Sequence, residues 1–147
     1  MALQKMQEEA MEVVKSLIQS EKDGTLSFGD FSLKEKQKKS DFKHEGDLYK
    51  VKSFYEITRL ERNGAFVYES VPGTSVFNLS VSDKEMSFGV TGKGDVQITL
   101  ELQAEKEYEV FVSGSSLGVM KTNLGGKLTF SVEAVEDAKC DIRIVEK

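Results

Sequence analysis

Apolar and polar positions alternate along most of the chain after Thr25, in short runs separated by turn residues. Because successive side chains of a β-strand point to opposite faces, such alternation indicates strands with one buried and one solvated face. After Pro72 the pattern predicts seven strands, over residues 75–81, 85–90, 96–102, 108–113, 118–122, 127–134 and 140–145. The predicted fold class is therefore mainly β, an antiparallel β-sandwich or jelly roll.

The strongest local signal is Asn63-Gly64, which lies between two apolar-rich runs. A type I′ turn needs positive φ at both central residues, and Asn-Gly is a preferred dipeptide for it. A two-residue turn fixes the register, and the predicted opposite pairs are Arg62 with Ala65, Glu61 with Phe66, Leu60 with Val67, Arg59 with Tyr68 and Thr58 with Glu69. In this register Arg59 lies over the ring of Tyr68 as a cation–π pair.

The first twenty residues predict one N-terminal α-helix, because their apolar residues follow the alternating three-four spacing of a heptad seam. The seam consists of Leu3, Met6, Ala10, Val13 and Leu17. A helix of this length is marginal by itself, so it must dock on its own domain or on copies of itself. An alternative assignment makes residues 13–20 a strand that turns back through Asp23-Gly24 into residues 25–28.

We therefore expect an N-terminal helix or oligomerisation segment over residues 1–22 and a β-rich domain over residues 23–147. A subdivision into residues 23–71 and 72–147 is possible, although the lack of a proline- or serine-rich linker favours one continuous body. The 147 residues, 39% hydrophobic and 31% charged, suit one soluble domain with an appendage.

Apolar runs are too short for a membrane span, and the first residues lack the apolar core of a signal peptide. The single cysteine, Cys140, allows no internal disulfide, which agrees with a reducing compartment. We expect a cytoplasmic protein, or a surface or extracellular protein that leaves the cell by a non-classical route.

Charge narrows the set of partners. The net charge of −5 argues against nucleic acid, since phosphate binding depends on an excess of lysine and arginine. One dense basic stretch runs from Lys34 to Lys43 and contains Lys34, Lys36, Lys38, Lys39 and Lys43. In a strand it would form either an edge protected against pairing or a strip that binds anions.

Residues that carry chemistry are few. His44 is the only histidine and is expected on the surface at a turn, while Cys140 is expected as a buried thiol in an alternating strand. The glycine-rich segments lack the strand–loop–helix setting of a phosphate loop. The sequence thus predicts no catalytic residue, no metal ligand and no cofactor.

Five segments carry a resemblance to a known family: residues 24–31, 46–52, 56–63, 67–74 and 120–128. Together they resemble a family of small bacterial proteins labelled endosialidase, over about residue 13 to the C-terminus. The label implies cleavage of polysialic acid, and the trimeric phage endosialidases imply a β-rich trimer. The half after Pro72 also resembles immunoglobulin-like accessory modules, most clearly in residues 107–114 and 127–132.

Two functions follow as hypotheses. The first is a non-enzymatic structural or interaction module that self-associates, as a trimer or a larger homo-oligomer. The alternative is a carbohydrate-binding or endosialidase-like glycan-processing module. Its expected contact residues are those of the hairpin and the neighbouring strand: Tyr49, Tyr55, Arg59, Phe66 and Tyr68.

Overall fold

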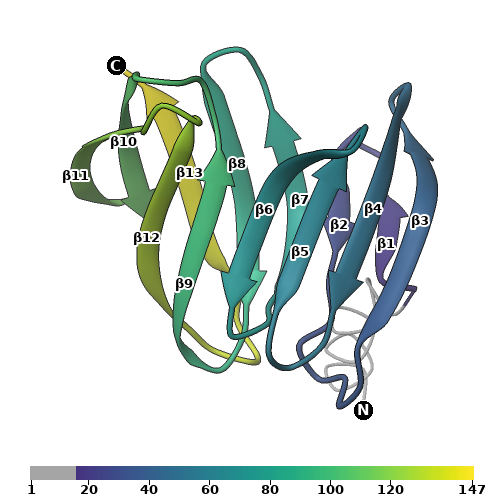
Figure 1. The fold of residues 1–147 in the computed structure, drawn as a ribbon. Helices are drawn as coiled ribbons and strands as arrows, with labels where there is room; N and C mark the ends of the chain where they lie inside the picture. Colours follow the sequence, from purple (N-terminus) through teal and green to yellow (C-terminus); the bar gives the residue numbers. More distant parts are fainter. Residues whose placement is uncertain (1–15) are drawn as a thin grey trace.

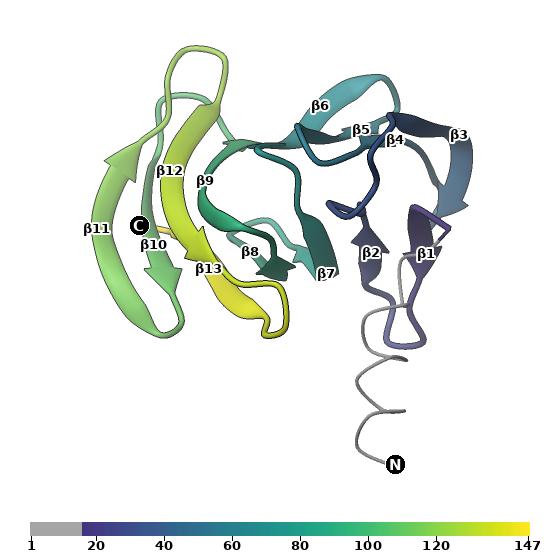
Figure 2. The same cartoon turned by 90° about the horizontal axis from the view of Figure 1, so that it is seen from below.

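The computed structural model describes residues 16–147, which form two antiparallel β-sheets enclosing one core (Figures 1 and 2). The first sheet has the order β1 (Ile18–Ser20), β2 (Leu26–Phe28), β7 (Ser75–Val81), β8 (Glu85–Thr91), β13 (Cys140–Glu146), β10 (Glu107–Val112), β11 (Ser115–Lys121). The second has the order β12 (Lys127–Ala134), β9 (Gly94–Glu101), β6 (Ala65–Val71), β5 (Thr58–Arg62), β4 (Asp47–Ser53), β3 (Gln37–His44).

The predicted class, an antiparallel β-sandwich, is confirmed, and each of the seven strands expected after Pro72 forms. β7 and β12 have the bounds that the alternation predicts, and the other five differ at their ends. Strands from both sides of residue 71 pair with each other, β2 with β7 and β6 with β9. Each sheet therefore draws on both of the segments considered as possible subdivisions.

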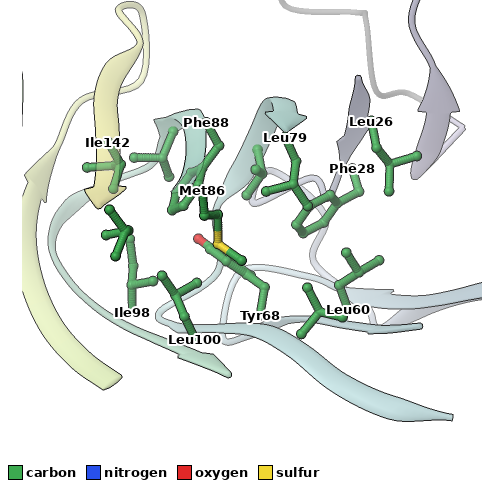
Figure 3. Close-up of a cluster of buried hydrophobic side chains, with 14 of the residues drawn as sticks. Leu26, Phe28, Leu60, Tyr68, Leu79, Met86, Phe88, Ile98, Leu100 and Ile142 are labelled. Atoms are coloured by element: carbon green, nitrogen blue, oxygen red, sulfur yellow. The ribbon is translucent and has the colours of Figure 1, made fainter. Parts of the chain in front are cut away.

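The core lies between the sheets and is built by the inward-facing position of each alternating strand (Figure 3). Tyr68 is at its centre, with its ring edge-on to Phe28 at 5.3 Å and to Phe88 at 5.6 Å between ring centroids. Such edge-to-face contacts add to the free energy gained by burying the rings. Other buried members are Leu26, Leu60, Leu79, Met86, Ile98, Leu100 and Ile142.

The N-terminal helix prediction is wrong where the structure can test it. Ile18–Ser20 form β1, which pairs with β2 across a turn at Asp23-Gly24, as the alternative assignment proposed. Leu17 is 8% exposed and packs in the core, so it is not part of an exposed oligomer seam. The apolar pattern of residues 13–20 is compatible with both a helix and a strand, and hydrogen bonding to β2 favours the strand at residues 18–20. Leu3, Met6, Ala10 and Val13 lie outside the described residues.

The hairpin turn is confirmed, but the predicted register holds for only two pairs. Asn63 and Gly64 have φ values of 51° and 81°, as a type I′ turn requires. A β-bulge follows the pair of Glu61 with Phe66, so that Leu60 lies opposite Tyr68 and Arg59 opposite Glu69. The extra residue is Val67, and it allows both Val67 and Tyr68 to be buried.

The C-terminal part of the lysine-rich stretch, with Lys38, Lys39 and Lys43, lies in an exposed edge strand, β3, as one of its two interpretations predicted, while Lys34 and Lys36 lie in the loop before it. Charged side chains at such a position discourage pairing with another chain. Within residues 16–147, no helix is long and apolar enough to cross a membrane.

Candidate functional site

The five residues expected to bind glycan do not share one exposed surface. Tyr49 and Tyr68 are buried in the core, with exposed fractions of 8% and 0%. Arg59 and Phe66 are half-buried on β5 and β6. Tyr55 is 53% exposed in the loop between β4 and β5. The hairpin therefore does not present the expected strip of aromatic rings.

Arg59 contacts a different ring from the one predicted. Because the bulge turns Tyr68 inward, the guanidinium lies over Phe66, 5.1 Å from the ring centroid. The Lys127 ammonium lies 3.7 Å from the same centroid. Both cations also have carboxylate partners, Glu69 for Arg59 at 3.3 Å and Glu101 for Lys127 at 3.1 Å. Arg59 also lies 3.7 Å from a Glu61 carboxylate oxygen, so both cations are neutralised within the cluster, which suits a contact that holds neighbouring strands together.

His44 is buried, contrary to the surface position expected from its turn-like sequence. Its Nε2 donates to the Gly24 carbonyl at 3.1 Å, and its Nδ1 then accepts from the Ser20 hydroxyl at 2.7 Å. The ring thereby connects β3 in one sheet with the β1–β2 hairpin in the other.

Cys140 is half-buried beside the Ser113 hydroxyl. Within residues 16–147, no group of His, Cys, Asp or Glu side chains could hold a metal ion.

One hollow, of about 480 Å³, opens between the sheets where the β5–β6 and β7–β8 turns lie. Its apolar floor includes Val67, Met86, Tyr108 and Ile144, none more than 7% exposed. Two of its rim carboxylates, Glu85 and Glu101, already pair with Arg143 and Lys127. These two carboxylates are thus already neutralised by neighbouring cations.

The four edges of the two sheets differ more clearly from one another, in how well each is protected against pairing with another chain. A strand at an edge presents unpaired N–H and C=O groups to any strand that arrives, and soluble proteins protect such edges. Of the four edges in residues 16–147, β1 is only three residues long, and β3 carries Lys38, Lys39 and Lys43. β12 carries Lys127 and Glu133 on its outer face. These three edges have recognisable protection.

The fourth edge, β11, differs from the others. It is seven residues long, almost fully exposed, and Lys121 at its end is its one charged residue. Leu117 and Val119 are 46% and 51% exposed, and Leu124 just beyond the strand is 81% exposed. Figure 1 shows β11 at the outer margin of the molecule, on the side opposite β3.

The backbone of β11 is oriented for a further partner. Thr122 donates its N–H to the Lys106 carbonyl, and Lys147 donates to the Glu107 carbonyl from the β13 side. Because hydrogen-bonded and non-hydrogen-bonded pairs alternate along an antiparallel ladder, Val119 and Lys121 direct their N–H and C=O groups away from β10. A bulge at Leu117 interrupts the ladder but leaves this stretch regular.

Sequence reasoning placed a strand over residues 118–122 but did not identify it as an edge. The available signal was composition, because residues 115–120 are uncharged whereas the edge strand β3 is rich in lysine. Which strands become edges depends on long-range pairing, and no local pattern supplies that information.

No protein-family model, curated protein or solved structure matches this chain. The function is therefore argued from the geometry of its surfaces.

Proposed function

We propose that the protein is a non-enzymatic building block that self-associates by pairing β11 with β11 of a second copy. The proposal rests mainly on the observation that β11 is a long edge, charged only at its last residue, Lys121, with Leu117 and Val119 exposed, while the other three edges within residues 16–147 are protected. Strand addition at such an edge supplies backbone hydrogen bonds and buries the apolar side chains beside them.

An antiparallel pair centred on Gly118 gives a two-fold symmetric contact. The opposite pairs are then Leu117 with Val119, Ser116 with Met120, and Ser115 with Lys121. Leu117 then meets Val119 on either side of the axis, and no like charges lie opposite each other. The same operation on β3 would bring lysines from both copies together. β11 is therefore self-complementary, as an isologous interface requires.

Pairing through one edge closes on itself, so this contact gives a dimer rather than an open fibre. A trimer, which the family resemblance implied, would need a contact other than a two-fold β11 pair. The measured number of copies therefore tests both whether β11 is the contact surface and whether the contact has two-fold symmetry.

The experiment measures the mass of the full chain by sedimentation velocity and light scattering. We expect the wild type to form dimers as concentration rises and the double variant Leu117→Lys/Val119→Lys to stay monomeric, because it gives β11 the protection that β3 has. The matched control is Leu48→Lys/Val71→Lys, which places the same two charges at similarly exposed apolar residues of β4 and β6, two strands inside the second sheet.

Circular dichroism establishes that each variant is folded. A wild type that stays monomeric at high concentration would refute the proposal, and so would a folded double variant that still dimerises. A trimer that survives the double substitution would assign assembly to another surface.

A further inference from the structure

The hollow between the sheets, at the end of the sandwich that is uppermost in Figure 1, extends into the core. Its volume of about 480 Å³ is within the range of sites that hold small molecules. The floor consists of Val67 from the second sheet and of Met86, Tyr108 and Ile144 from the first. All four side chains belong to the core, so a ligand on this floor would contact both sheets.

Apolar side chains on the inner faces of the strands stay uncovered around the mouth of this hollow. Val81 lies opposite Met86 in the β7–β8 pair and therefore faces inward, yet it is 47% exposed. Ala65, beside the β5–β6 turn, is also exposed, and Leu102, just after β9, is half-buried. An apolar surface that lies within a hollow and is surrounded by polar residues is typical of a binding site.

Tyr108 adds one polar group to this apolar surface. The residue is 3% exposed, and its hydroxyl oxygen accepts a hydrogen bond from the Gln103 N–H at 3.1 Å. A phenol can donate a hydrogen bond as well as accept one, and within residues 16–147 the Tyr108 proton has no acceptor. Gln103 also lines the hollow, so the hydroxyl lies at its wall. A ligand with an acceptor oxygen would give this buried donor a partner.

The loop that carries Gln103 is held in place from behind. Thr122 Oγ1 donates to the Gln103 carbonyl at 2.6 Å, and the Leu102 N–H donates to the Gly126 carbonyl at 2.7 Å. Gly126 packs so closely on the Leu102 carbonyl that a Cβ would not fit there. Because the loop is already fixed, a ligand would lose little affinity to ordering it.

The charges around the mouth do not favour an ion of either sign. The two rim glutamates are paired with neighbouring cations. The other charged side chains of the lining are Arg62, Asp83 and Lys84, which carry both signs and are exposed to water. Exposed charges of this kind contribute little to binding energy. Recognition therefore depends on the apolar floor and on the Tyr108 hydroxyl.

We propose that this hollow binds a neutral amphiphile, a short aliphatic chain that carries one acceptor oxygen, as in a ketone, an ester or an amide. The chain packs on Val67, Met86 and Ile144, and the oxygen accepts the free proton of Tyr108. The inference goes beyond self-association, and no residue of β11 lines the hollow.

The test is a titration of the full chain, followed by nuclear magnetic resonance of isotope-labelled methionine methyl groups. Met86 lies on the floor, so its methyl resonance reports binding there. We expect methyl hexyl ketone to shift this resonance, and methyl butyl ketone, two methylenes shorter, to bind about tenfold more weakly. Octanoate and octylammonium should also bind about tenfold more weakly than the longer ketone, because a charged group loses hydration beside the apolar floor.

Two variants test the contacts separately. Tyr108→Phe should weaken binding of methyl hexyl ketone about fivefold and leave that of toluene, which has no acceptor oxygen, unchanged. Val81→Asp places a charge at the mouth and should weaken binding of both probes about tenfold. The control Val71→Asp makes the same change at a similarly exposed valine of β6 outside the hollow and should alter neither.

Several outcomes would overturn the inference. They are an unshifted Met86 resonance up to the solubility limit of the ketone, equally tight binding of either ion, and wild-type affinity for the ketone in folded Tyr108→Phe. The Leu117→Lys/Val119→Lys protein should bind the ketone with the wild-type Kd per chain. A failure of self-association and a failure of ligand binding are therefore separate results.

Discussion

Tyr68 joins the apolar core to a buried group of hydroxyls around Thr74. Its ring is fully buried between Phe28 and Phe88, while its hydroxyl forms a 2.8 Å hydrogen bond with Thr74 Oγ1. Ser70 Oγ shares the same Thr74 oxygen, also at 2.8 Å. Burial disfavours the phenolate and raises the pKa of Tyr68 from 10.0 to about 12.

This shift predicts a loss of stability in alkali. Below pH 10 the hydroxyl is protonated in both the folded and the unfolded chain, so the stabilisation is fully present. Between pH 10 and about 12 only the unfolded chain releases the proton, so the free energy of unfolding falls by about 1.4 kcal/mol per pH unit. Denaturant titrations of wild type and Tyr68→Phe should show this extra fall in the wild type alone. Parallel curves for the two proteins would contradict the assignment.

The sequence predicted the structural role of some single residues correctly and that of others wrongly. Asn63 and Gly64 were identified because turn chemistry is local. The burial of Tyr68 was not, because it depends on a bulge that lets Tyr68 pair with Leu60 on one side and Leu100 on the other. The burial of His44 was also missed, because its hydrogen-bond partners lie 20 and 24 residues away along the chain, beyond the reach of a local pattern.

At the scale of elements, the short β1–β2 hairpin depends on His44. The ring binds Ser20 and Gly24 and also packs edge-on against Tyr49, at 5.9 Å between ring centroids. Figure 2 shows β1 beside β3, although the two strands belong to different sheets. The side chain of His44 thus fastens the sheets together at this margin of the sandwich.

We expect His44→Ala to lower the free energy of unfolding by about 1–3 kcal/mol, because it removes two hydrogen bonds and the packing of the ring against Tyr49. Amide exchange should accelerate most in Ile18–Ser20 and least in the β9–β12 pair, where no contact is lost. Lys43→Ala, at the exposed neighbouring position, should change stability by about 0.5 kcal/mol or less. Uniform acceleration across both sheets would instead indicate that β1 opens only with global unfolding.

For the molecule as a whole, alternation predicted the sandwich because each strand needs one apolar face, whatever its neighbours are. It could not predict which strands lie side by side, and therefore which edges stay open. The candidate surface depends on that arrangement, because β11 is an edge only through the order of the strands in its sheet. Of the five residues expected to contact glycan, Tyr55 alone is exposed, and the others are half-buried or buried.

Assembly through β11 also predicts how whole-molecule stability responds to concentration. If the dimer is the folded form that predominates, the wild-type Tm should rise with protein concentration by mass action. The Tm of Leu117→Lys/Val119→Lys should stay constant over the same range, because its edge cannot pair. Scanning calorimetry measures both, and a concentration-independent wild-type Tm would count against the dimer.

The direction of β11 decides what a pair of these molecules could do. A two-fold axis through Gly118, perpendicular to the sheet, reverses the strand, so the ends of the two sandwiches that carry the β4–β5 and β6–β7 loops point in opposite directions. Any partner that binds at this end would find two sites facing away from each other, so the dimer would be bivalent.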